Sequence, residues 1–150
     1  MKKYIVVILS LLSFLNVSVF AAGDVPYTKA EIKSLMKKVA DWQLAHQKEV
    51  KHHPMDWTNA TLYIGMVKWA ELADKVDKDE TYYKWLVDIG NRYSWKANKR
   101  MYHADDLAVC QMFIDVYKRY KDKSMLQPTI ERIDWILEHP SKGSLIIDYS

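Results

Sequence analysis

Apolar side chains recur at the spacing of an α-helix in five segments, and this pattern constrains the fold of the chain more than any other feature. The sequence has only 4 Gly and 4 Pro, too few for the many tight turns of a β-sandwich or a β-barrel. We therefore predict an all-α protein. Its helices are expected over residues 28–46, 58–76, 79–98, 105–120 and 125–137.

The first of these segments carries the clearest signal for a helix start. Thr28 and Glu31 match a capping box, in which a hydroxyl and a carboxylate each accept a hydrogen bond from a free backbone N–H. The apolar residues Ile32, Leu35 and Val39 follow at helical spacing. The sequence therefore predicts an amphipathic helix that begins next to Thr28.

The four later segments form two similar pairs of helices. A shift of 47 residues places Met66 on Phe113 and Leu86 on Ile133, and each pair has a short polar turn between its helices. A helix–turn–helix repeat of this length is typical of stacked hairpins, as in an α-solenoid or a closed α/α toroid. The first helix of each pair is richer in small and aromatic residues, so we expect it to be the inner one.

The first 21 residues have the composition of a secretory signal peptide. Lys2 and Lys3 precede an apolar run from Tyr4 to Phe20, and Ala21 offers a small residue at the cleavage point. The run is about 17 residues long and contains polar residues, which makes it short for a helix that spans a membrane. We therefore predict a cleavable signal over residues 1–21, a secreted or periplasmic protein, and no stable membrane anchor.

The remaining residues, 22–150, have nearly balanced charge. The whole sequence has 22 Lys and Arg against 19 Asp and Glu, and loss of Lys2 and Lys3 with the leader lowers the net charge from +3 to +1. This balance argues against a nucleic-acid-binding protein, so no nucleic-acid partner is expected. The length predicts one domain. Cys110 is the only cysteine, which excludes an internal disulfide and predicts a buried thiol on a helix.

Two adjacent carboxylates, Asp105 and Asp106, follow His103 at the start of a predicted inner helix. Like charges at neighbouring positions repel, and the repulsion can raise the pKa of one carboxyl until it holds a proton near neutral pH. A protonated carboxyl beside an ionised one is suited to general acid–base catalysis. The structural alternative is that one Asp caps the helix while the other stabilises its positive end. The sequence leaves both interpretations open.

A second cluster begins at Trp57, just before the other predicted inner helix. An indole ring there, with the hydroxyl of Tyr63 six residues later, can present a flat apolar face and a polar group to a sugar. The structural alternative is that Trp57 covers the helix start, that Thr58 or Asn59 is the N-cap, and that Gly65 allows close packing of helices.

Four histidines, His46, His52, His53 and His103, raise the question of a metal site. His52 and His53 are adjacent in a predicted loop, which is a poor geometry for two ligands of one ion, and no Cys or His motif accompanies them. No Gly-rich phosphate-binding loop is present either. We therefore predict no metal site and no cofactor.

Three strings of the sequence carry a resemblance to a known family. They are DWTNATLYIGM over residues 56–66, DETYY over residues 79–83 and YHADD over residues 102–106. In this order they resemble the start of the family 105 glycoside hydrolases, the unsaturated rhamnogalacturonyl hydrolases, which are related to the family 88 unsaturated glucuronyl hydrolases. The similarity runs from about Val39 to the end of the chain. It implies an (α/α)₆ toroid more than twice as long as this chain, of which these residues would form the first part.

The resemblance also implies an activity. Enzymes of this family remove a Δ4,5-unsaturated uronic acid from the non-reducing end of oligosaccharides, here pectin-derived rhamnogalacturonan fragments, by hydration of the double bond. An aspartate protonates the double bond and activates water. The expected partner is therefore an unsaturated uronyl oligosaccharide. The alternative that needs only the repeat and the aromatic residues is a non-catalytic, exported helical module that binds a protein or a glycan.

The resemblance assigns roles to particular residues. The Asp105–Asp106 pair falls where the family has one of its two active-site aspartates, and Asp106 is favoured because it lies at the head of the helix. The second aspartate is expected beyond Ser150. Trp57 falls where the family lines its sugar pocket, and Tyr63 and His103 are the other candidates for binding the substrate.

Overall fold

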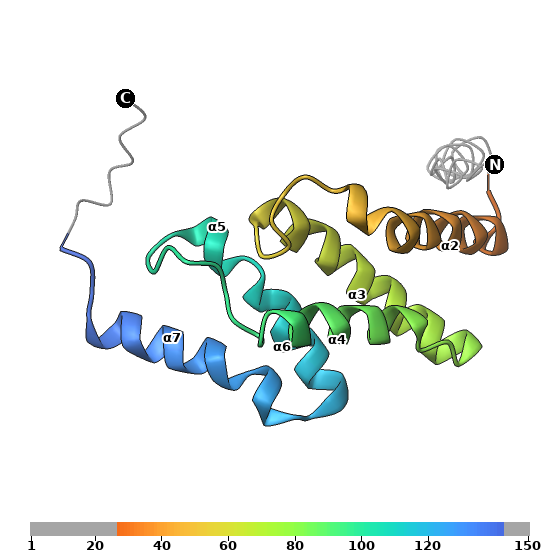
Figure 1. Cartoon of the computed structure of the whole chain (residues 1–150). Coiled ribbons are helices and arrows are strands. Elements are labelled where there is room, and N and C mark those ends of the chain that lie inside the picture. Colours follow the sequence, from red (N-terminus) through yellow and green to blue (C-terminus); the bar gives the residue numbers. More distant parts are fainter. Residues whose placement is uncertain (1–26, 143–150) are drawn as a thin grey trace, which may run out of the picture. The chain divides into compact units, whose positions relative to one another are not determined.

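The computed structural model describes residues 27–142, and every regular element in that range is a helix (Figure 1). The α-helices are α2 (Lys29–His46), α3 (Trp57–Asp77), α4 (Thr81–Arg92), α5 (Ala104–Leu107), α6 (Cys110–Tyr120) and α7 (Gln127–Glu138). Two short 3₁₀ helices, η1 (Gln47–Glu49) and η2 (Lys123–Met125), precede α3 and α7. The all-α prediction is confirmed. The predicted signal peptide lies outside the described residues.

Residues 1–35 and 36–150 form two separate units. In the described part of the first unit, the predicted capping box is confirmed. The backbone N–H of Thr28 donates to Glu31 Oε2 at 2.7 Å, and the backbone N–H of Glu31 donates to Thr28 Oγ1 at 3.2 Å. These reciprocal bonds satisfy two free N–H groups and fix the start of α2. The apolar residues Ile32 and Leu35 that follow are exposed.

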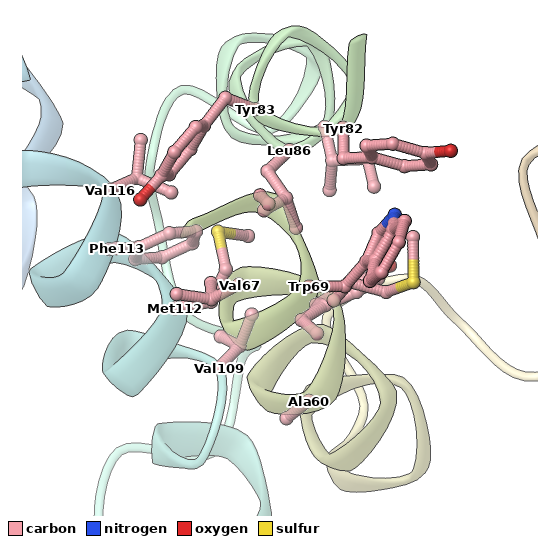
Figure 2. Packing of buried hydrophobic residues seen from close by; sticks show 14 of the residues in the cluster. Ala60, Val67, Trp69, Tyr82, Tyr83, Leu86, Val109, Met112, Phe113 and Val116 are labelled. Carbon is pink, nitrogen blue, oxygen red and sulfur yellow. The ribbon is translucent and has the colours of Figure 1, made fainter. Parts of the chain in front are cut away.

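The core of the second unit lies where α3, α4 and α6 pack together (Figure 2). The buried side chains come from all three helices and include Val67, Leu86, Met112, Phe113 and Val116, which are fully enclosed. Apolar residues at helical spacing supply this core because each helix turns one stripe inward. Among residues 27–142, no helix is long and apolar enough to cross a membrane.

Residues related by the 47-residue repeat are both buried in the first helix of each pair, but not in the second helix. Met66 and its equivalent Phe113 are both buried, at 4% and 0% exposed. Leu86 on α4 is 0% exposed, whereas its equivalent Ile133 on α7 is 39% exposed. The difference arises because α4 packs on both α3 and α6, and the described residues place no comparable cover over Ile133.

Helix α4 ends six residues earlier than the sequence predicts. Ser94 and Trp95 both have positive φ, at 52° and 56°, and the backbone N–H of Trp95 donates to the carbonyl of Gly90 at 2.8 Å. The Trp95 ring folds back over the last turn of α4 and meets the ring of Phe113 edge-on at 5.4 Å. A Cβ atom on Gly90 would lie 2.5 Å from this ring, so glycine is required there.

The start of α3 differs in detail from the structural alternative considered for Trp57. The N-cap is Asp56, whose Oδ1 accepts the backbone N–H of Trp57 at 2.8 Å. Asn59 is buried and its amide donates to the carbonyls of His52 and His53. Gly65 is exposed, and a Cβ added there would meet nothing within 4 Å. Within residues 27–142, the expectation that Gly65 allows close helix packing is therefore wrong, because none of these residues packs on that face of α3.

Candidate active site

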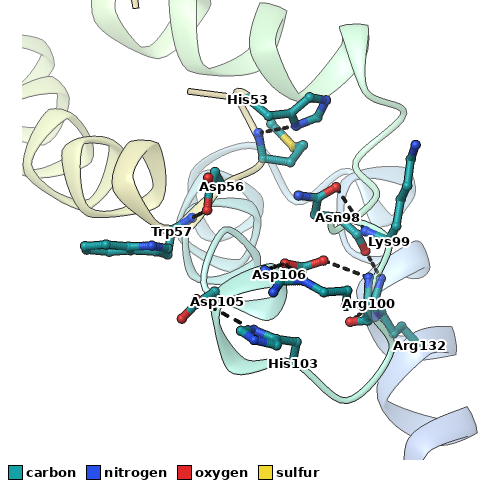
Figure 3. A network of polar contacts seen from close by, with 11 residues as sticks. His53, Asp56, Trp57, Asn98, Lys99, Arg100, His103, Asp105, Asp106 and Arg132 are labelled. Atoms are coloured by element: carbon teal, nitrogen blue, oxygen red, sulfur yellow. Dashed lines mark hydrogen bonds and ion pairs between the residues drawn. The ribbon is translucent and has the colours of Figure 1, made fainter. Parts of the chain in front are cut away.

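The carboxylate of Asp106 is buried, with 1% of its surface exposed, and it holds the turn that precedes α5 (Figure 3). Its Oδ2 accepts the backbone N–H of Arg100 at 2.7 Å. Its Oδ1 accepts two hydrogen bonds from the Arg100 guanidinium, one from Nε–H at 3.0 Å and one from Nη2–H at 2.6 Å. The backbone carbonyl of Asp106 accepts the N–H of Asn98 at 3.3 Å. Asp106 therefore fixes residues 98–106 in two ways: its side chain binds the guanidinium and backbone N–H of Arg100, and its backbone carbonyl binds Asn98.

The Arg100 guanidinium lowers the pKa of Asp106 below its usual value, although burial alone would raise it. The prediction that repulsion between neighbouring carboxylates raises a pKa is therefore wrong for Asp106, because the positive charge of Arg100 at 2.6 Å outweighs the other influences on this group. Asp106 is ionised at neutral pH. It is also no helix cap, since its oxygens bind Arg100 and the N-cap of α5 is His103, without a side-chain cap.

Asp105 lies on the open side of the same short helix. Its side chain is 45% exposed, and its Oδ2 is 3.7 Å from Nδ1 of His103, which is too long for a hydrogen bond. The His103 Nδ1 atom is itself buried and has no hydrogen-bond partner in the described part of the chain. Asp105 and His103 thus present a carboxylate and an unsatisfied ring nitrogen side by side, with water or a ligand free to reach the carboxylate.

Trp57 is the first residue of α3, and its indole is 50% exposed. Helix α5 packs against α3, and Figure 3 shows Trp57 and Asp105 on these two neighbouring elements. Tyr63 lies elsewhere. It is 2% exposed, meets the ring of Trp85 edge-on at 5.7 Å, and burial raises the pKa of its hydroxyl. His103 and the two aspartates thus lie at α5, and Trp57 begins the neighbouring helix α3, whereas Tyr63 is enclosed in the core.

Two arginines that sequence reasoning did not single out complete this arrangement. Arg100 is close in sequence to Asp106, so an arginine five residues before the acidic pair was a signal that could have been used. Arg132 lies on α7 and donates from Nη1 to the carbonyl of Asn98 and from Nη2 to the carbonyl of Arg100, the latter at 2.5 Å. Nothing in the local pattern around Arg132 marks this role, because it depends on how α7 returns to the turn.

The histidines of the predicted loop have structural contacts. Nδ1 of His53 accepts the backbone N–H of Met55 at 3.2 Å, and its ring meets Tyr93 edge-on at 5.3 Å. Within residues 27–142, no three His, Cys, Asp or Glu side chains converge so that they could hold a metal ion. Cys110 is buried and unpaired, and burial raises the pKa of its thiol.

Comparison with known proteins identifies the family. Residues 35–146 match the family model described as Glycosyl Hydrolase Family 88. Two relatives are each described as an unsaturated 3S-rhamnoglycuronyl hydrolase. The one from Formosa agariphila is 31% identical over 107 residues, which cover 70% of this chain and 27% of the relative. The one from Alteromonas sp. is 25% identical over 124 residues, which cover 75% of this chain and 29% of the relative.

The chain thus spans less than a third of the length of either relative. The resemblance to the group of families 88 and 105 that the three sequence strings indicated is confirmed at the level of that group. Because the match covers most of the residues that the structure describes, the chain belongs to glycosyl hydrolase family 88.

Proposed function

We propose that this chain supplies part of the active site of a hydrolase that removes a Δ4,5-unsaturated uronic acid from the non-reducing end of an oligosaccharide. Its family membership and the names of both relatives support this activity. The observation that carries the proposal is the half-exposed carboxylate of Asp105 on α5, next to a turn fixed by Asp106 and Arg100. Helix α5 packs against α3, which begins with the exposed indole of Trp57.

We assign different roles to the two aspartates, on the basis of their exposure and contacts. Asp105 is open to solvent, so its carboxylate can accept hydrogen bonds from sugar hydroxyls and exchange a proton with water. Asp106 is enclosed and its charge is bound by Arg100, so in this arrangement it holds Asp105 and His103 in place. Hydration of the double bond also requires a group that first donates a proton and then activates water. We propose that a second aspartate, beyond Ser150, serves as this group.

The proposed substrate is an unsaturated uronyl residue attached to rhamnose. We favour pectin-derived rhamnogalacturonan fragments, and the names of the two relatives make a 3S-rhamnoglycuronyl compound the competing substrate. Trp57 would stack on the sugar, because an indole offers a large flat apolar surface at a small entropic cost. We also propose that residues 1–21 are a cleaved signal peptide, which would place the protein in the periplasm or outside the cell with such fragments.

The test is turnover by the complete gene product with two disaccharides, one from rhamnogalacturonan and one of the 3S-rhamnoglycuronyl type. Hydration destroys the conjugated acid, so the ultraviolet absorbance of the substrate falls. Asp105→Asn should lower kcat by about 10²–10⁴-fold, the usual range for a group that transfers protons. Residues 1–150 alone, measured in parallel, should show no turnover.

Four outcomes would overturn parts of the proposal. If the absorbance falls with neither of the two disaccharides, the proposed activity is wrong. If a disaccharide binds but is not turned over, the non-catalytic module is favoured. Full activity in Asp105→Asn would remove this carboxylate from the site. Turnover by residues 1–150 alone would show that no second aspartate outside this stretch is required.

A further inference from the structure

Three rings cluster where the end of α7 meets the turn before α5. The rings of Trp135 and His139 are stacked, with centroids 4.5 Å apart and planes inclined by 15°. The ring of Tyr102 lies 5.9 Å from Trp135 at 49°. Trp135 and Tyr102 are 40% and 47% exposed, and His139 is exposed as well. The cluster therefore presents aromatic surface to solvent.

Hydrogen bonds hold the rings of His139 and Tyr102, and the ring of Trp135 contacts both of them. Nδ1 of His139 lies 2.9 Å from the carbonyl of Trp135, which holds the imidazole against the indole. The Tyr102 hydroxyl donates to the carbonyl of His139 and so ties the turn to the end of α7. Because the rings are already ordered, a ligand that stacks on them loses little additional side-chain entropy on binding.

One residue of the cluster, Tyr102, lies in the same turn as the proposed active site. Tyr102 directly precedes His103, and Asp105 follows two residues later. Arg132, one turn before Trp135 on α7, donates to the carbonyls of Asn98 and Arg100 within that turn. Tyr102 and Asp105 therefore lie on one segment of backbone, and hydrogen bonds of Tyr102 and Arg132 tie this segment to α7, which carries the other two rings.

We propose that Trp135, Tyr102 and His139 form an aromatic platform that binds a neutral pyranose ring of the oligosaccharide, beyond the unsaturated uronyl residue. This inference rests on the proposed function. The C–H face of a pyranose is apolar and flat, so it matches an exposed indole, whereas the charged uronyl group is better served by the polar groups around α5. If the platform instead binds another protein, the oligosaccharide used in the experiment will not bind to it.

The chain contains a matched control for this platform. On α2, Trp42 stacks on His46 with centroids 4.3 Å apart and planes inclined by 16°, and Nδ1 of His46 lies 2.8 Å from the carbonyl of Trp42. Trp42 is 54% exposed. This pair repeats the local geometry of Trp135 and His139 but lies outside the turn that carries Asp105. Trp135→Ala and Trp42→Ala therefore remove the same group from the same kind of surface.

The first measurement uses NMR titration to determine how tightly a saturated rhamnogalacturonan hexasaccharide binds to the chain. This probe lacks the unsaturated ring, so the result does not depend on the proposed hydrolysis. Trp135→Ala should weaken binding about tenfold, the effect of losing roughly 1.4 kcal/mol of contact, and Trp42→Ala should leave it unchanged. Trp135→Phe, which keeps a ring, should retain most of the affinity and serves if the alanine variant fails to fold.

The second measurement is hydrolysis by the complete gene product of an unsaturated disaccharide and an unsaturated hexasaccharide. Trp135→Ala should raise KM for the hexasaccharide about tenfold while kcat stays constant, and a disaccharide that does not reach the platform should be unaffected. Absence of all hydrolysis would remove the proposed function and leave the binding result standing. Unchanged hexasaccharide binding in a folded Trp135→Ala variant would overturn the platform, as would equal losses in both tryptophan variants or no binding by the unmodified chain.

Discussion

Replacing Asp106 by Asn keeps the shape of the side chain and removes its charge, which isolates what the ion pair with Arg100 contributes to stability. In the folded chain, three N–H groups of Arg100 donate to this carboxylate. The amide of Asn offers one acceptor oxygen, and its NH₂ group would face N–H donors of Arg100. At least one of the three bonds is therefore lost, and a donor is placed against a donor in a site that is 1% exposed.

The magnitude follows from these bonds. A hydrogen bond to a charged group contributes about 1.5–3 kcal/mol, and an unsatisfied buried group costs about 1–3 kcal/mol. The Arg100 side chain is 55% exposed, so water can solvate its guanidinium and part of the loss is recovered. We expect Asp106→Asn to lower the free energy of unfolding by about 2–3 kcal/mol, or the Tm by about 8–12 °C for a domain of this size.

Urea unfolding followed by circular dichroism measures this difference. Asp105→Asn is the matched control, because it makes the same exchange one residue earlier on an exposed side chain, and it should change the stability by less than about 0.5 kcal/mol. An Asp106→Asn variant as stable as the unmodified chain would refute the reasoning. Equal destabilisation by both exchanges would refute it too, because the ion pair would then not be the cause.

The pH dependence of the same variant provides an independent check. Because the pKa of Asp106 is lower in the folded chain than in the unfolded one, its charge stabilises the fold above the unfolded value of about 3.9. This contribution is lost as the pH falls through the folded pKa. The stability difference between the unmodified chain and Asp106→Asn should therefore be constant near neutral pH and shrink below about pH 4. A difference that does not shrink in acid would exclude the charge as its source.

Two further predictions concern the helical core. Gly90→Ala should destabilise the chain by about 1–3 kcal/mol, because the new methyl group meets the Trp95 ring at 2.5 Å. Gly65→Ala, at an exposed position of α3, should stabilise the chain by up to about 1 kcal/mol. Urea midpoints of both variants test this, and a neutral Gly90→Ala would show that Trp95 does not hold its position. Cys110 is buried with a raised pKa, so its thiol should react with Ellman's reagent only slowly at neutral pH and rapidly in urea. Fast reaction of the folded chain would show that α6 opens locally.

Local patterns in the sequence were sufficient for the features that depend on neighbouring residues. The capping box of α2 was predicted from Thr28 and Glu31 because both partners lie within one helical turn. Burial of Met66 and Phe113 was also predictable, because apolar periodicity identifies the stripe that a helix turns inward. These features need no knowledge of how distant segments meet.

The predictions that were wrong concern features that depend on contacts which the periodicity of apolar residues does not encode. Helix α4 ends at Arg92 because Trp95 packs over Gly90 and Phe113, and the pattern gave no indication of that return. The pKa of Asp106 depends on Arg100, whose approach is set by the path of the turn. The family resemblance assigned Trp57 and the aspartates to one site, and this stays a prediction. Enclosure of the Tyr63 side chain follows from packing against Trp85.

The contacts of Arg132 with the turn before α5 have a consequence for how this family could diversify. Both of its bonds go to backbone carbonyls, those of Asn98 and Arg100, and backbone carbonyls are present whatever the side chains are. Exposed positions of the turn such as Lys99 can therefore change without loss of the anchor to α7. A segment next to a proposed sugar site is thus free to acquire new side chains, and with them new substrate preferences, while its path stays the same. Selection for a different oligosaccharide would act on the turn with little penalty in folding.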